Sequence, residues 1–146
     1  MNPIFKKLHL PDSGPALVLN APDEFLAMLS ETKFEIHEEI LDFYNYVQVF
    51  VQDEEEANDL VAEGISALEP GAYFWFCFPK LKSTNYETNL DEKLIVEILE
   101  SFDMGGVTQV SLNDDWLAMR IKFNDEIGGD FDANSKGSKR MHDLYD

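Results

Sequence analysis

The chain has 146 residues, of which 45% are hydrophobic, which is enough for one domain that buries most of its apolar side chains. Its 29 Asp and Glu residues outnumber 11 Lys and Arg, giving a formal net charge of −18. Such a surface is soluble and repels phosphate backbones and anionic lipid headgroups. The composition therefore argues against nucleic acid and membranes as partners, and among protein partners it favours a basic one.

The sequence also predicts where in the cell the protein is located. Lys6 and Lys7 are not followed by the apolar run of a signal peptide, and no stretch approaches the ~20 apolar residues of a membrane span. The single cysteine, Cys77, cannot form an internal disulfide. We therefore expect a cytoplasmic protein.

The first part of the chain predicts three strands and one helix. Residues 16–20 indicate a buried strand, and a helix begins at Pro22, where proline and the acids after it suit a first turn. Residues 34–40 alternate apolar and polar side chains, which predicts a half-buried strand at an edge of the sheet. Residues 46–51 are β-branched and aromatic and predict a further strand.

The middle of the chain predicts a helix followed by a central strand. Asp53 and Glu56 have the spacing of a capping box, and apolar residues follow at helical spacing. Pro70 and Gly71 are expected to end this helix. Residues 73–78 are apolar on both faces, which is typical of a strand covered on both sides.

The last part predicts a helix, a hairpin and a tail. Asn89 and Glu92 give a second cap signal before the most amphipathic segment of the chain. Residues 107–112 and 116–123 are expected to pair as an antiparallel hairpin. From Asn124 the composition changes, so we predict a domain over residues 1–123 and an acidic, flexible tail over 124–146.

The alternation of strands and helices predicts the fold class. It indicates a single α/β domain of three layers, with a mostly parallel, Rossmann-like sheet, helices on both faces and a closing antiparallel hairpin.

Residues 46–123 resemble the later half of class I methyltransferases. The order of elements is similar, and residues 68–76, a Pro-Gly turn leading into an apolar strand, look like a segment of that family. The resemblance implies a reduced methyltransferase-like sheet. That family holds its cofactor with a glycine-rich turn after the first strand, whereas the turn at residues 20–23 has no glycine and contains a proline, which lacks a backbone donor. No cofactor is therefore predicted.

Three short segments support a second resemblance. Residues 19–22, 78–80 and 115–116 together resemble a family of small bacterial α/β domains of unknown function. This similarity covers most of the predicted domain and implies no activity.

Candidate ligand-binding residues follow from the predicted sheet. Ligands of such sheets gather at the carboxyl ends of the strands, which makes Asn20, Asp23, Asp53 and Lys80 the crevice candidates. Lys80 is the most informative, because a lysine directly after an apolar strand of an acidic protein could receive an anion. It could equally pair with a neighbouring carboxylate.

The sequence predicts neither a catalytic residue nor a metal site. The three histidines are far apart, with no cysteine at ligand spacing. Cys77 lies between two phenylalanines and is interpreted as core, and no serine lies in a Gly-x-Ser-x-Gly turn. Residues 130–134 begin like a calcium loop, but Ser135 and Met141 replace the glycine and glutamate that such a loop needs.

Two functional hypotheses remain. We favour a non-enzymatic acidic binding or regulatory module, since phosphate, metal and nucleophile signatures are missing. The alternative is a reduced S-adenosylmethionine-methyltransferase-like domain that keeps a small-molecule crevice. The first predicts an exposed apolar or aromatic patch with an acidic rim, and the second predicts a concave pocket beside Asn20 and Lys80.

Overall fold

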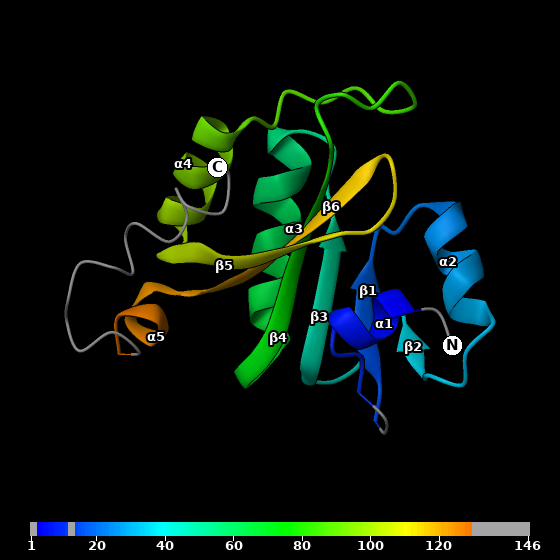
Figure 1. The fold of residues 1–146 in the computed structure, drawn as a ribbon. Helices are drawn as coiled ribbons and strands as arrows, with labels where there is room; N and C mark the ends of the chain where they lie inside the picture. The colour runs from blue at the N-terminus through cyan, green and yellow to red at the C-terminus, as the bar shows by residue number, and fades with distance from the viewer. Residues whose placement is uncertain (1–2, 12–13, 130–146) are drawn as a thin grey trace.

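The computed structural model describes residues 3–11 and 14–129 and contains a six-stranded sheet (Figure 1). The strand order is β2-β1-β3-β4-β6-β5; β1 to β4 are parallel, β6 is antiparallel to β4, and β5 is antiparallel to β6. The strands are β1 Ala16–Leu19, β2 Ile36–His37, β3 Tyr44–Phe50, β4 Leu68–Pro79, β5 Met104–Ser111 and β6 Trp116–Phe123. This confirms the predicted mostly parallel sheet with a closing hairpin.

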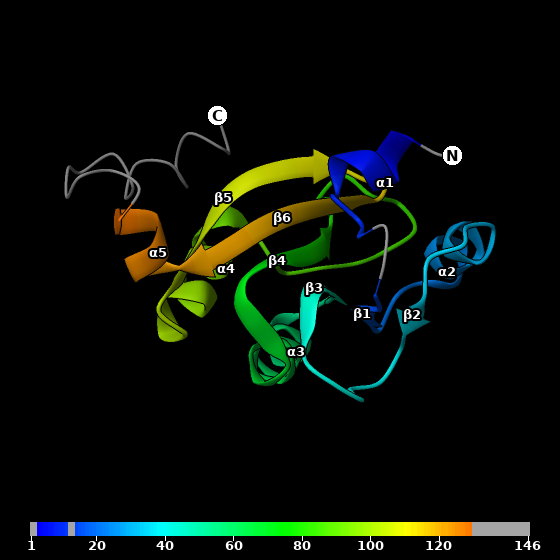
Figure 2. The ribbon, with the colours of Figure 1, turned by 90° about the horizontal axis from the view of Figure 1, so that it is seen from below.

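Helices cover both faces of the sheet, as Figure 2 shows for α1 on one side and for α3 and α4 on the other. The helices are α1 Pro3–Lys7, α2 Asp23–Ser30, α3 Glu54–Ser66, α4 Glu92–Ser101 and α5 Asn124–Gly129. Helices α3 and α4 pack on the face that carries Val47 and Phe76, and α1 and α2 pack on the face that carries Trp75. The three-layer prediction is therefore confirmed. Helix α1 was not predicted, although Phe5 anchors it in the core.

Acidic side chains begin the two long helices. The Asp53 carboxylate accepts a hydrogen bond from the Glu56 amide at 2.9 Å and caps α3, as predicted. The Glu56 carboxylate accepts from the Gln52 amide at 2.8 Å, one residue before the cap. Asp91 caps α4 through the Leu94 amide, so the predicted cap at Asn89 is wrong. The Asp91 amide instead donates to the Asn89 carbonyl in a turn before the helix.

The start of β4 differs from the prediction. Helix α3 ends at Ser66, and β4 already begins at Leu68, so Pro70 and Gly71 lie within a strand and do not end the helix. The Tyr44 amide donates to the Ala67 carbonyl at 2.8 Å, which draws this segment into the sheet beside β3. The predicted strand over residues 34–40 shrinks to the two residues of β2, which lies at the sheet edge as expected.

A hydrogen-bonded polar group is buried at the centre of the sheet. The Tyr46 hydroxyl donates to Gln48 Oε1 at 2.7 Å, and Gln48 Nε2 donates to Cys77 Sγ at 3.2 Å. Burial raises the pKa of the Cys77 thiol well above its usual value. The interpretation of Cys77 as a core residue is confirmed.

The end of the described chain forms a short helix. Residues 124–129, the first part of the predicted tail, make α5, and Ile127 of this helix is buried. The rest of that segment, including the calcium-like pattern at residues 130–134, lies outside the described residues. Among the helices that the structure describes, none is long and apolar enough to cross a membrane.

Candidate functional site

The order of the strands reverses between β1 and β3. From β1 the chain passes through α2 to β2 on one side, and it then returns to β3 on the other side of β1. In open α/β sheets, ligands bind in the crevice outside the carboxyl ends of the strands at such a point. This crevice is where Asn20 and Asp53 were expected to act.

Asn20 joins the two strand ends at this point. Its Nδ2 donates to the Phe50 carbonyl at 2.8 Å, which ties the end of β1 to the end of β3. Its backbone has φ 63°, a conformation that asparagine tolerates better than most residues. Asp53 caps α3, and Asp23 is exposed at the start of α2. The structure therefore gives Asn20 and Asp53 contacts within the fold.

A segment of the chain also covers this crevice. The strap, defined as residues 80–91 between β4 and α4, runs across the carboxyl ends of the strands (Figure 1). Gln52 Nε2 donates to the Glu87 carbonyl at 2.9 Å, and the Thr88 hydroxyl donates to the Gln52 carbonyl at 2.7 Å. The Tyr86 hydroxyl donates to Glu24 Oε1 of α2 at 2.7 Å. The strap thus lies over the end of β3 and reaches α2.

Aromatic side chains fill the space below the strap. Trp116 is 4% exposed, and its ring centroid lies 5.3 Å from that of Phe50 and 5.0 Å from that of Tyr86. Phe25 of α2 lies 5.0 Å from Phe50. Trp116 is therefore a packing residue. These aromatic side chains occupy the place where sheets of this kind receive a ligand.

The Tyr86 contact gives the strap a pH dependence. The hydrogen bond to Glu24 raises the pKa of Tyr86 above its usual value of 10.0, and partial burial adds to this, while the Trp116 indole acts against it. Because the pKa of Tyr86 is higher in the folded than in the unfolded state, its protonated hydroxyl contributes fully to stability below pH 10. This contribution is lost as the pH rises through the pKa that Tyr86 has in the folded state. We therefore expect stability to fall more steeply above pH 10 in wild type than in Tyr86→Phe. Urea unfolding at a series of pH values measures this, and equal slopes would contradict it.

A groove lies at the carboxyl end of β4, on the side of α4. It has a volume of about 520 Å³, within the range of small-molecule sites. Its lining is formed by the end of β4, the start of the strap, the start of α4 and one residue of β6: Phe78, Pro79, Lys80, Leu81, Lys82, Leu90, Asp91, Glu92 and Leu117. Phe78 and Leu90 are buried, whereas Leu81 is 66% exposed. The groove is thus mainly apolar with charged groups beside it.

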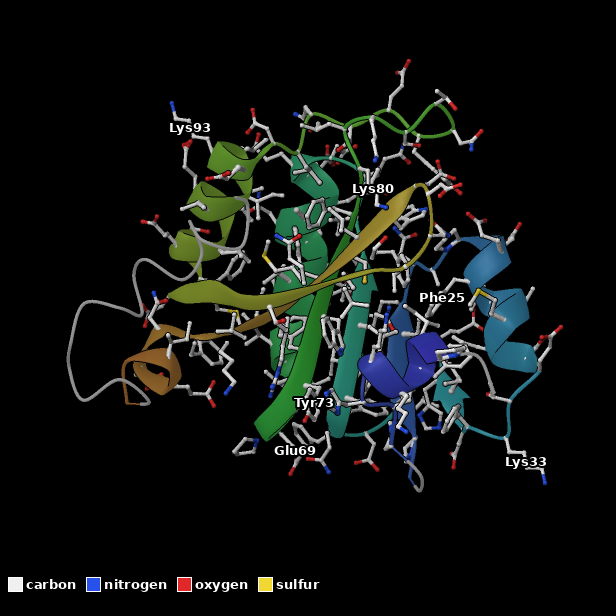
Figure 3. The ribbon with its side chains drawn as sticks, in the orientation of Figure 1. Phe25, Lys33, Glu69, Tyr73, Lys80 and Lys93 are labelled. Atoms are coloured by element: carbon white, nitrogen blue, oxygen red, sulfur yellow. The ribbon has the colours of Figure 1, made fainter. Side chains whose placement is uncertain are left out.

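Two lysines stand at this groove. Lys80 Nζ donates to Ser111 Oγ at 2.8 Å, and Figure 3 shows Lys80 beside the hairpin, at the end of β4 opposite Glu69. Within the described residues, neither Lys80 nor Lys82 forms an ion pair with a carboxylate. Two lysines without a described ion pair therefore stand beside one apolar groove, whose lining also includes Asp91 and Glu92. The lysines suit the anionic group of a ligand, and the apolar lining suits its apolar body.

The predicted site residues do not form one site. Lys80 lines the groove, but Asn20, Asp23 and Asp53 do not, so the pocket lies beside only one of the two residues named for it. Sequence reasoning missed Lys82, Leu90 and Leu117. The run 80–82, with lysines on both sides of a leucine directly after the central strand, is the signal that could have pointed to Lys82.

Comparisons with known proteins support the fold. No family model and no curated protein matches the chain, so the resemblance to small bacterial domains has no support. Among solved structures, the chain resembles the glycopeptide N-methyltransferase MtfA complexed with S-adenosylmethionine, with 14% identity and a TM-score of 0.52 over 82% of this chain and 91% of that one.

A second MtfA structure gives 13% identity and a TM-score of 0.51 over 82% and 88% of the two chains. The chain also aligns with ribosomal protein L11 methylase from Lactobacillus delbrueckii subsp. bulgaricus, with 13% identity and a TM-score of 0.47. That alignment covers 76% of this chain and spans 58% of the methylase. The two MtfA alignments support a methyltransferase-like α/β fold for this chain.

Proposed function

We propose that the chain is a reduced methyltransferase-like domain that binds a small amphipathic anion in the groove beside Lys80. The observation that carries this proposal is the pair of lysines, neither in an ion pair among the described residues, at an apolar groove of about 520 Å³. The carboxyl edge of the sheet is the usual place for ligands in α/β folds, which supports the choice of this groove. The crevice at the ends of β1 and β3, here called the strand-reversal crevice, is crossed by the Asn20–Phe50 hydrogen bond and covered by the strap. This favours the groove over that crevice as the ligand site.

A ligand screen by thermal shift tests this proposal. The probes are octanoate, phenyl phosphate, S-adenosylmethionine and S-adenosylhomocysteine. A ligand at about 100 times its Kd adds about 2.7 kcal/mol of stability, which raises the Tm by several degrees. We expect an amphipathic anion to raise the Tm of wild type and to have little effect on Lys80→Ala/Lys82→Ala.

A charge-matched variant controls this experiment. Lys33→Ala/Lys93→Ala removes two exposed lysines outside the groove, which Figure 3 labels, and changes the net charge equally. It should keep the full Tm shift. An equal loss in both double variants would show a general charge effect and refute the proposal. Binding of an adenosyl compound that survives Lys80→Ala/Lys82→Ala would move the site to the strand-reversal crevice.

The preference for a non-enzymatic module stays a prediction. Ligand binding in this groove is compatible with it, because a regulatory domain also needs a ligand site.

A further inference from the structure

The connection between β2 and β3 exposes a group of large apolar side chains. Ile40 is 39% exposed, Leu41 64% and Phe43 63%. Among the described residues, the other large hydrophobic side chain exposed to this degree is Leu81 at the groove. Ile40, Leu41 and Phe43, here called the 40–43 patch, therefore form a concentrated apolar surface on one short loop, away from the proposed ligand groove.

Hydrogen bonds to the buried Tyr44 fix the backbone of this loop. Tyr44 is 1% exposed, and its hydroxyl accepts a hydrogen bond from the Leu41 amide at 3.0 Å and lies 2.7 Å from His37 Nδ1. The Phe43 amide donates to Asp42 Oδ1 at 2.8 Å. Because the backbone is tied to a buried side chain, the exposed side chains are presented on a fixed support, which lowers the entropy cost of binding.

Acidic residues flank the patch along the chain. Glu35, Glu38, Glu39 and Asp42 lie within the same ten residues, and all four are exposed. No lysine or arginine occurs between residues 34 and 79 of the chain. His37 lies beside this group, and its Nε2 is 2.9 Å from Glu35 Oε2. The surface therefore combines an apolar centre with an acidic rim.

We propose that the 40–43 patch is a docking surface for a basic amphipathic segment of another protein. Leu41 and Phe43 supply the apolar contact, and the acidic rim attracts cationic side chains and sets the specificity. A second copy of this chain carries the same net charge of −18 and would be repelled, as would an anionic membrane. Charge complementarity therefore selects a basic partner.

Three synthetic peptides test this proposal on the full chain. One is an amphipathic peptide of Leu and Lys, the second has Ser in place of Leu at the same charge, and the third has Glu in place of Lys. Calorimetry measures their affinity, and backbone amide NMR locates the contact. We expect the Leu-Lys peptide to bind more tightly than the other two, to shift the amides of residues 38–44, and to bind more weakly as the salt concentration rises.

Matched variants separate the patch from the general charge. Leu41→Ser/Phe43→Ser should weaken the Leu-Lys peptide about tenfold or more, whereas Leu81→Ser, which removes an equally exposed leucine elsewhere, should leave its affinity unchanged. Glu38→Gln/Glu39→Gln/Asp42→Asn should weaken binding and reduce its salt dependence. These positions are exposed, so each variant is expected to fold, and its circular dichroism spectrum checks this.

Several outcomes would overturn the proposal. They are equal binding of the Ser-Lys peptide, unchanged binding by Leu41→Ser/Phe43→Ser, or no binding of the Leu-Lys peptide. A wild-type dimer in analytical ultracentrifugation that Leu41→Ser/Phe43→Ser converts to a monomer would assign the patch to a second copy instead. The anion-induced Tm shift of the groove should persist in this double variant, so the two proposals fail independently.

Discussion

Replacing Gly64 with alanine is expected to destabilise the protein by about 1–3 kcal/mol, although alanine is the better helix former. Gly64 lies in α3 where the helix meets the sheet. A Cβ atom here would come within 2.6 Å of Phe74 Cζ and 3.3 Å of Val47 Cγ1. Phe74 is completely buried, so its ring can yield only by displacing the side chains packed around it. Urea unfolding would measure the loss.

A double-mutant cycle isolates this contact. Phe74→Leu shortens the ring that the new methyl group would meet, so Gly64→Ala should cost less in the Phe74→Leu background than in wild type. Strictly additive effects would mean that the helix does not approach β4 as closely as described.

We further expect Asn20→Ala to destabilise the protein by about 2–3 kcal/mol. The variant loses the hydrogen bond to the Phe50 carbonyl, which contributes about 1 kcal/mol, and places alanine at φ 63°, which costs a further 1–2 kcal/mol. Thermal and urea unfolding would measure the effect. An exposed side chain with neither such a hydrogen bond nor a positive φ, by contrast, would change stability little when replaced.

Glycine at the same position separates the two contributions. Asn20→Gly also loses the hydrogen bond, but glycine adopts positive φ readily, so it should cost about 1 kcal/mol less than Asn20→Ala. Equal losses in the two variants would contradict the role given to the backbone conformation. Anion binding in the groove should survive Asn20→Gly, because Asn20 does not line it.

Much of the fold could be predicted because its signals are local. The apolar run of β4 indicated a central strand, and Asp53 with its spacing to Glu56 located the start of α3. Pro70 and Gly71 wrongly indicated a helix end, because proline and glycine are common where elements end. In the structure, a tertiary hydrogen bond from Tyr44 to Ala67 places this segment in the sheet. Local propensity cannot register such a long-range contact.

The candidate site was harder to predict because its parts come from different elements. Lys80 was found by its place after the central strand, but the groove also needs Leu90 from the strap and Leu117 from β6. The bond from Asn20 to Phe50 joins residues 30 positions apart, so nothing near Asn20 in the sequence indicated that its amide is already engaged. Ile40 was predicted to lie in a half-buried strand over residues 34–40, so the alternating pattern did not indicate the exposure of the 40–43 patch.

The burial of Cys77 determines when this residue can be oxidised. Its thiol lies on β4 next to Gln48 of β3 and is completely buried, and its raised pKa keeps it in the unreactive protonated form. Oxidants can therefore reach it only in molecules whose sheet has opened. A charged sulfinic or sulfonic group would be unfavourable in this buried position beside Gln48, so oxidation of an unfolded molecule would oppose its refolding, and the cell could not easily reverse it.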